Sequence, residues 1–154
     1  MADPFTRSIV VLASLDDVYQ IWANFENFPR FMKYIKSVTL TGDRTSHWVM
    51  TGPLGVDIEW DAETTRRDEN ERVAWNSKDN SPVKTSGQVQ FRQVGPNETE
   101  VTVTLTYEPP AGVAGDALAA IFANPEKRVM DDLEHFKAHV ESTSLRIHTR
   151  TEAK

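Results

Sequence analysis

The sequence of 154 residues contains no cysteine, and this absence removes several kinds of chemistry. A disulfide framework, a thiolate metal site and a cysteine nucleophile are all excluded. Long apolar runs are also missing, because no stretch reaches the roughly 18 apolar residues that a membrane-spanning helix needs. The first residues, Met1–Arg7, are mixed in character, so we expect no signal peptide and a cytoplasmic location.

Positive charge is scarce relative to negative charge. Lysine and arginine together number 17, against 23 aspartate and glutamate residues, which gives a net charge of −6. Nucleic-acid binders need many cationic contacts to phosphate groups, so we expect no nucleic-acid partner. Hydrophobic residues make up 39% of the chain, a share typical of folded globular domains and not of disordered chains.

The chain length fits one domain. We expect this domain to span residues 1–142 and a polar tail to span residues 143–154, where Leu145 and Ile147 form at most a short extended stretch. A domain of this size buries roughly two-thirds of its unfolded surface, which is enough for one core and an internal cavity.

The N-terminal part is expected to form a strand over residues 5–13 followed by two short helices. Ser14 has the properties of a helix N-cap, and apolar residues at spacings of three and four follow it up to Trp22. Pro29, placed in the first turn, favours a second short helix after Asn24.

The middle of the chain changes to the period-two pattern of strands. Its clearest stretch is 56–66, where Val56, Ile58, Trp60 and Ala62 alternate with acidic residues. Short turns separate the stretches, which indicates antiparallel neighbours. The expected strands are 35–41, 46–51, 56–66, 72–77, 85–94 and 100–107.

A long amphipathic helix is expected to close the domain. Asn124 and Pro125 provide an N-cap and a first helical residue, and an apolar stripe follows. The stripe consists of Val129, Leu133, Phe136 and Val140, with Lys127, Asp131, Glu134 and Lys137 on the opposite face. The fold class is therefore α+β, with a curved seven-stranded antiparallel sheet, two short helices after the first strand, and a long C-terminal helix on the apolar face.

The residues that could carry polar chemistry are predicted to lie outside the interior. The acidic row Asp57, Glu59, Asp61 and Glu63 shares the strand face opposite Trp60, which is the solvent face. Such carboxylates can act as an acid–base pair or bind a cation, but a solvated face is the simpler interpretation.

The histidines give no better candidate. His135 and His139 lie one helical turn apart, but the glutamate of a zinc motif and a third ligand are missing. His47 neighbours Trp48 and is expected to face outward. We therefore predict no metal site, no catalytic residue and no cofactor.

Several short motifs occur in the order found in a known superfamily. The longest is Trp22–Met32, a helix-to-loop segment rich in aromatic residues. The others are Gly52–Gly55, Glu59–Trp60, Gly87–Phe91, Thr99–Val101, Tyr107–Pro110 and Asp132–Lys137. Together these motifs resemble the START-like (SRPBCC) superfamily, and within it the polyketide cyclase/dehydrase and coenzyme Q-binding group, over roughly Phe5–Val140.

The resemblance implies a helix-grip fold, in which the sheet wraps around the C-terminal helix and leaves a cavity for a small apolar ligand. Aromatic and methionine side chains would form its wall, although ordinary core packing explains any one of them about as well. The residues expected to line the cavity are Phe28, Phe31, Tyr34, Trp48, Met50, Trp60, Trp75, Phe91, Leu105, Tyr107, Phe122 and Met130. Gly87 shares the parity of Val89 and Phe91, so a larger residue there is expected to narrow the cavity.

Three functions fit this pattern. The first is a binding or carrier protein for a lipid, a quinone or a polyketide-like compound. The second is an aromatase/cyclase or dehydratase, which needs an inward polar group, with Tyr34, Tyr107, Asn76 and Arg72 as the choices. The third is a protein-interaction module, which we would favour if the space between sheet and helix held no void of roughly 300 Å³.

Overall fold

The computed structural model describes residues 4–52, 55–79, 81, 84–108 and 125–152. The sheet strands are β1 (Phe5–Val11), β2 (Ile35–Leu40), β3 (Thr45–Thr51), β4 (Asp57–Asp68), β5 (Arg72–Ser77), β6 (Lys84–Gly95) and β7 (Glu98–Glu108). The helices are α1 (Leu15–Ala23), the 3-10 helix η1 (Phe25–Arg30) and α3 (Pro125–Glu152).

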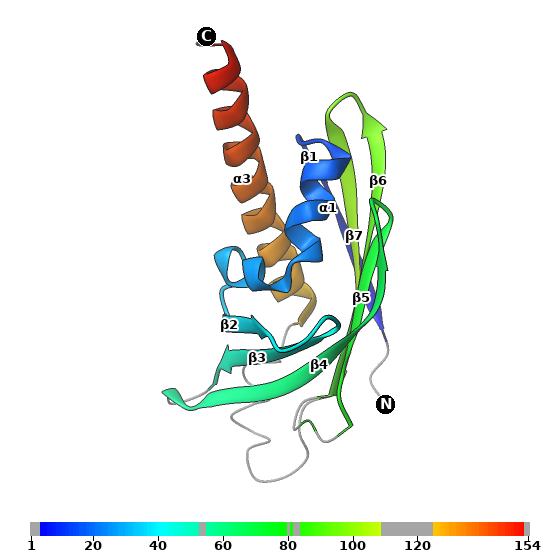
Figure 1. The fold of residues 1–154 in the computed structure, drawn as a ribbon, viewed down its shortest axis with the longest axis vertical. Helices are drawn as coiled ribbons and strands as arrows, with labels where there is room; N and C mark the ends of the chain where they lie inside the picture. The colour runs from blue at the N-terminus through cyan, green and yellow to red at the C-terminus, as the bar shows by residue number, and fades with distance from the viewer. Residues whose placement is uncertain (1–3, 53–54, 80, 82–83, 109–124, 153–154) are drawn as a thin grey trace.

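The seven strands form one antiparallel sheet in the order β1-β7-β6-β5-β4-β3-β2. Strands β2 to β7 follow one another as a meander, and β1 pairs with the last strand, β7. The sheet bends strongly, so β2–β4 run nearly crosswise to β6 and β7, and α3 lies on its hollow side (Figure 1). This arrangement confirms the α+β fold with a sheet curved around the C-terminal helix.

Turn and cap residues explain where the elements begin and end. The β4–β5 and β6–β7 turns contain Asn70 and Asn97, both at positive φ, a conformation that asparagine adopts more readily than most residues. The Ser14 side chain accepts a hydrogen bond from the backbone N–H of Asp17, as a helix N-cap should. Asn24 caps η1 in the same way through Glu26. Both short helices are therefore confirmed, but the expected place of Pro29 in the first turn was wrong, because Pro29 lies near the end of η1.

The alternation in β4 is largely confirmed. Trp60 and Ala62 are buried and Ile58 is partly buried, while the acidic residues between them are exposed. Val56 is the exception, because it precedes β4 and is 65% exposed. Its predicted place on the apolar face was wrong.

Helix α3 begins at Pro125, and three residues of its predicted stripe, Leu133, Phe136 and Val140, are fully buried. The backbone of residues 143–152 continues this helix. The short extended stretch expected at Leu145 and Ile147 was therefore wrong, because the helix runs on through a segment whose polar composition we had interpreted as a tail. In the described part of the chain, no helix has the length and apolar character needed to cross a bilayer.

The core is rich in aromatic rings. We call Trp22, Phe25, Phe28, Phe31 and Phe136 the aromatic core; they join α1, η1 and α3. Trp22, Phe31 and Phe136 contact one another with ring centroids 5.1–5.2 Å apart. Such tilted ring pairs stabilise the packing beyond the area that they bury. The aromatic core thus fixes the two short helices between α3 and the sheet.

Candidate functional site: an apolar cavity between the sheet and α3

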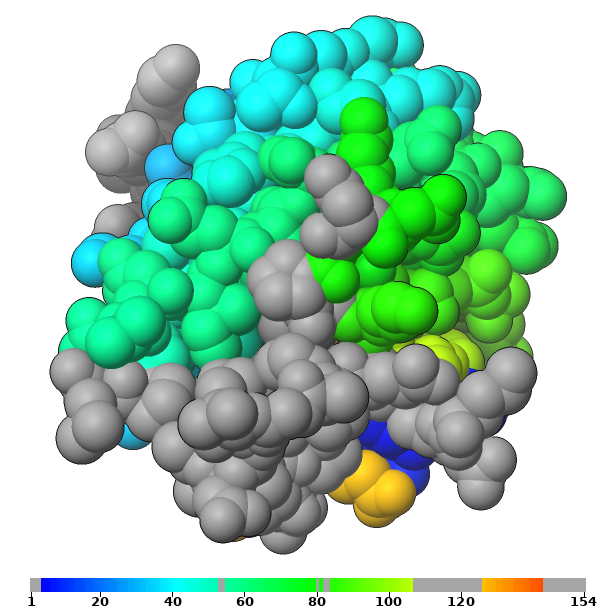
Figure 2. All heavy atoms as spheres, turned by 90° about the horizontal axis from the view of Figure 1, so that it is seen from below, coloured from blue at the N-terminus to red at the C-terminus, as the bar shows by residue number. Residues whose placement is uncertain are grey.

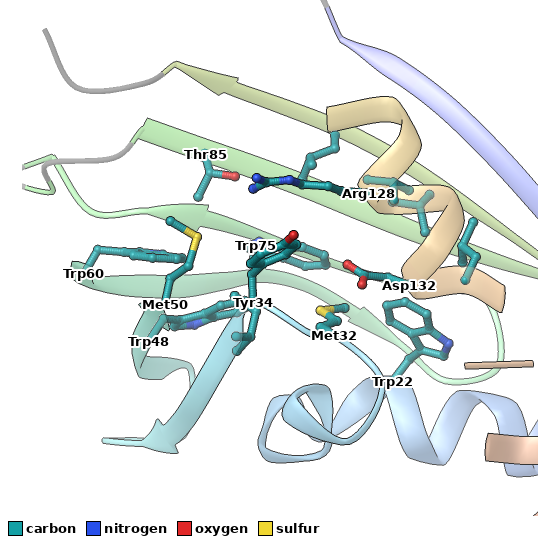
Figure 3. Close-up of a pocket in the computed structure, with 15 residues that line it drawn as sticks. Trp22, Met32, Tyr34, Trp48, Met50, Trp60, Trp75, Thr85, Arg128 and Asp132 are labelled. Carbon is teal, nitrogen blue, oxygen red and sulfur yellow. The ribbon is translucent and has the colours of Figure 1, made fainter. Parts of the chain in front are cut away.

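A cavity of about 160 Å³ lies between the sheet and the first turns of α3 (Figure 3). Nearly all of its wall is hydrocarbon or aromatic. The described residues that line it are Trp22, Met32, Tyr34, Ile35, Trp48, Met50, Trp60, Trp75, Thr85, Val103, Leu105, Arg128, Val129, Asp132 and Leu133. Every strand from β2 to β7 contributes, so the curvature of the sheet creates the space.

One side of the cavity is built from three tryptophans, Trp48, Trp60 and Trp75, which we call the tryptophan wall. They come from β3, β4 and β5, and all three are at least 94% buried. Trp48 lies directly opposite Trp60 in the strand register and stacks on both partners, with centroids 5.8 and 5.9 Å away. The three indole side chains therefore lie on the same inner face of three neighbouring strands.

Gly87 makes the position of Trp75 possible. The two residues are opposite each other in β6 and β5, and a Cβ on Gly87 would meet the Trp75 indole. The glycine therefore supports the tryptophan wall and does not border the cavity. Our expectation that a larger residue at Gly87 would simply narrow the cavity was wrong, because it would first displace Trp75.

The polar groups of the cavity gather near α3. The Arg128 guanidinium lies over the Tyr34 ring, 4.2 Å from its centroid, in a cation–π contact. Arg128 extends from α3 toward Thr85 on β6, and Asp132 points from the next helical turn into the cavity (Figure 3). Two lining residues, Trp22 and Trp60, have indole N–H groups that are buried in the protein and have no acceptor among the described residues.

Asp132 has the most perturbed acidity in the site. Burial raises the pKa of its carboxyl group to about 7, because desolvation disfavours the charged form. The backbone N–H of Lys33 hydrogen-bonds the carboxyl group, and His135 and Arg128 are nearby cations; these act in the opposite direction but do not cancel the effect. Near neutral pH the carboxyl group therefore exists in both protonation states, so it can donate a hydrogen bond or transfer a proton.

Six of the twelve residues predicted to line the cavity do so: Tyr34, Trp48, Met50, Trp60, Trp75 and Leu105. Phe28 and Phe31 instead belong to the aromatic core, and Phe91 packs edge-on against Tyr19. Met130 packs against the core from α3. Phe28, Phe31 and Phe91 are buried and Met130 is partly buried, but none of the four lines the cavity. Phe122 and the side chain of Tyr107 lie outside the described residues.

Sequence reasoning missed the polar residues of the cavity. Arg128 and Asp132 each directly precede a residue of the helix stripe, the partly buried Val129 and the buried Leu133, and lie four residues apart. That spacing on the flank of the stripe is the signal that could have identified them. Of the polar groups we had considered, Asn76 is exposed and Arg72 lies beside Asp68, whereas Tyr34 lines the cavity. The side chain of Tyr107, the fourth, lies outside the described residues.

The outer face of the sheet behaves as predicted. Asp57, Glu59, Asp61 and Glu63 are all exposed. Residues of the middle of the chain, coloured cyan to green, form much of the surface that is seen from below (Figure 2). His47 also faces outward and bridges Glu59 and Asp61, at 2.8 and 2.9 Å. These two carboxylates raise the pKa of His47. Within the described ranges, no three His, Asp or Glu side chains are placed to hold a metal ion.

The size of the cavity differs from our expectation. Its volume of about 160 Å³ is below the roughly 300 Å³ usual for a pocket that encloses a drug-sized ligand. A larger, more open hollow of about 540 Å³ lies at the ends of β5 and β6, but polar side chains such as Asn76, Lys78 and Lys84 line it. The apolar cavity is therefore below the size limit set above, and by that limit alone the protein-interaction module would be favoured. The hydrocarbon and aromatic lining of the cavity is what still supports a site for an apolar ligand.

Comparison with known proteins adds family information. The model of a family described as polyketide cyclase/dehydrase and lipid transport matches residues 11–134. An uncharacterised 17.2 kDa protein of Streptomyces lincolnensis is 32% identical over 137 residues, which cover 88% of this chain and 87% of that protein.

Solved structures agree with the fold. A Deinococcus radiodurans protein superposes with a TM-score of 0.73 at 28% identity, covering 92% of this chain and 98% of that one. The aromatase/cyclase ZhuI of a Streptomyces species superposes equally well, with a TM-score of 0.73, at 17% identity and over 92% of this chain and 94% of that one. At that identity the likeness concerns the fold and not the chemistry.

Proposed function

Because the chain belongs to the polyketide cyclase/dehydrase and lipid transport family, we propose that it is a binding or carrier protein for a small apolar molecule. The ligand is held between the sheet and α3, in a domain formed by residues 1–142, and the protein works in the cytoplasm. Lipids, quinones and polyketide-like compounds are the ligand classes that this proposal includes.

The observation that supports the proposal best is the exposed apolar surface inside the molecule. The three stacked tryptophans and several aliphatic side chains border an open volume. Protein interiors are normally packed without such voids, because each missing contact costs dispersion energy. An apolar ligand would supply those contacts.

The volume limits what the cavity can enclose. About 160 Å³ suits a compact ring system or one segment of a longer chain. Met32 and Met50 line the space, and their flexible side chains can adapt to ligands of different shape.

Thermal unfolding with straight-chain methyl ketones of increasing length tests the proposal. A ligand that binds only the folded state stabilises it by about 2.7 kcal/mol at a hundred times its Kd, which raises the Tm by several degrees. We expect the shift to reach a maximum at one chain length and to be smaller in Leu105→Phe, which fills part of the cavity. Exposed Glu134→Gln is the control variant. No Tm shift at any length would favour the protein-interaction module instead.

A second candidate function is catalysis of the aromatase/cyclase or dehydratase type, and Asp132 favours it. A carboxyl group with a pKa of about 7 at the edge of an apolar cavity can give and take a proton at neutral pH. For this function, Asp132→Asn should retain ligand binding and abolish turnover of a poly-β-keto substrate. If wild-type protein binds such a substrate without converting it, catalysis is contradicted and the carrier function is supported.

A further inference from the structure

Within the proposed function, on which this step rests, we infer that the cavity selects neutral molecules carrying a carbonyl-type oxygen, and that Asp132 selects them by donating a hydrogen bond from its protonated carboxyl group. Asp132 is then a specificity-determining residue, and ligand binding takes up a proton.

The carboxyl group of Asp132 borders the cavity and also receives a hydrogen bond from the backbone. The Lys33 backbone N–H bonds the carboxyl group from the segment before β2, and the side chain points into the cavity (Figure 3). In a neutral carboxyl group, the carbonyl oxygen accepts this N–H and the hydroxyl group is a donor. That donor faces an apolar space, where an acceptor on the ligand is worth more than in water.

The other polar groups of the cavity are also mostly donors. Tyr34 contributes a hydroxyl group and Arg128 a guanidinium group. A hydrocarbon offers such donors no acceptor, whereas a ketone or quinone oxygen does.

The charged and titratable groups around Asp132 come from two elements. Lys33 and Tyr34 lie in the segment before β2, and Arg128, Asp131 and His135 lie on α3. The lining residues that face Asp132 from α1 and the sheet carry no charge. When Asp132 ionises, its carboxylate becomes an acceptor and repels the oxygen of a ketone, so affinity should fall as pH rises through about 7.

Equilibrium dialysis of two matched probes tests this inference. The probes are 2-acetylnaphthalene, which has a carbonyl oxygen, and 2-isopropenylnaphthalene, in which a CH₂ group replaces that oxygen. For wild-type protein we expect the Kd of the ketone to increase between pH 6 and pH 8.5 by roughly 30-fold, or about tenfold per pH unit above the pKa. The Kd of the hydrocarbon should change much less.

Three variants separate the role of Asp132 from a general effect on folding. Asp132→Asn keeps a donor that does not titrate, so it should bind the ketone at both pH values. Asp132→Leu keeps the size and loses the donor, so it should bind both probes alike. Glu134→Gln, an exposed change on the same helix, should behave as wild type. Circular dichroism verifies that each variant is folded.

The outcomes distinguish this inference from the function on which it rests. If both probes bind with equal affinity at every pH, or if Asp132→Asn keeps the wild-type pH profile, the role of Asp132 is refuted and the carrier function stands. If neither probe binds wild-type protein, the proposed function fails, and the inference fails with it.

Discussion

The two ends of the interior use the same kinds of residue and pack them differently. At one end, the rings of Trp22, Phe31 and Phe136 contact one another with centroids 5.1–5.2 Å apart and join α1, η1 and α3. At the other end, the tryptophan wall stacks along the sheet and faces an open cavity, which Trp22 also borders. The difference teaches that burial alone does not separate a core aromatic residue from one that lines a cavity; the packing of the neighbouring elements does.

The titratable groups of α3 follow the same division. Asp132 lies at the cavity and has a raised pKa, while His139, about two turns later, lies 6.3 Å from Phe31 and has a pKa lowered by burial and by Arg30. In both cases burial disfavours the charged form. Of these two groups, Asp132 is the one that borders the cavity.

Removing a side chain should have its largest effect in the aromatic core. Phe136→Ala is expected to lower the free energy of unfolding by about 3–5 kcal/mol, because Phe136 is fully buried and its loss opens a new void. Leu105→Ala should cost about 1–2 kcal/mol, since Leu105 is only partly buried and already borders a cavity. Urea unfolding measures both changes, and equal losses would contradict the division.

The cavity end should respond to pH through Asp132. Its pKa is about 7 in the folded protein and near 3.8 in the unfolded chain, so the folded state binds more protons between these values. Stability that depends on Asp132 is therefore highest below pH 4 and is lost as pH rises toward 7.

Asp132→Asn removes this dependence. The variant should be more stable than wild type by about 1–3 kcal/mol at pH 8 and nearly equal to it at pH 4. Urea unfolding across this range measures the difference, with Glu134→Gln as the exposed control. A difference that does not vary with pH would show that Asp132 titrates normally.

The tryptophan wall should depend on Gly87. Gly87→Ala places a methyl group against the Trp75 indole, and we expect a loss of about 1–3 kcal/mol from overpacking. The near-ultraviolet circular dichroism of the tryptophans should change as well. Gln88→Ala, one residue along the same strand and on its other face, should change neither property. Full stability of Gly87→Ala would show that the stack has room to move.

Adding volume should have the smallest effect where space already exists. Leu105→Phe is expected to change stability by less than about 1 kcal/mol, because the ring can enter the cavity. Val89→Phe, at a fully buried position of β6, should cost about 1–3 kcal/mol. Thermal unfolding of the pair measures the contrast. If Leu105→Phe is the more damaging change, the cavity is not available to side chains.

The sequence predicts the fold well because strand alternation and turn residues are local signals. All seven strands lie within two residues of their predicted limits, and Ser14 caps α1 as expected. Alternation also placed Trp60 on the inner face, and the family resemblance added Trp48 and Trp75. These properties depend on neighbours along the chain, which a sequence shows directly.

The cavity could be predicted only in part because it depends on long-range geometry. Phe28 and Leu105 both have inward positions, but η1 places Phe28 in the aromatic core and the bend of the sheet leaves Leu105 beside the void. Asp132 was missed because an acidic residue on a helix normally faces water. The segment before β2, which contains Lys33, packs against this flank of α3 and partly buries it.

The open edge of the sheet at β1 has a consequence for the behaviour of the protein in concentrated solution. Two side chains of α3 occupy main-chain groups there: Lys137 donates to the Val10 carbonyl, and Glu141 accepts from the Leu12 N–H. A bare edge strand is a template on which another chain can add a strand, and such addition leads to fibres. Lys137 and Glu141 therefore make two main-chain groups at this edge less available for pairing with a strand of another molecule. The helix that bounds the cavity thus also opposes strand addition at β1.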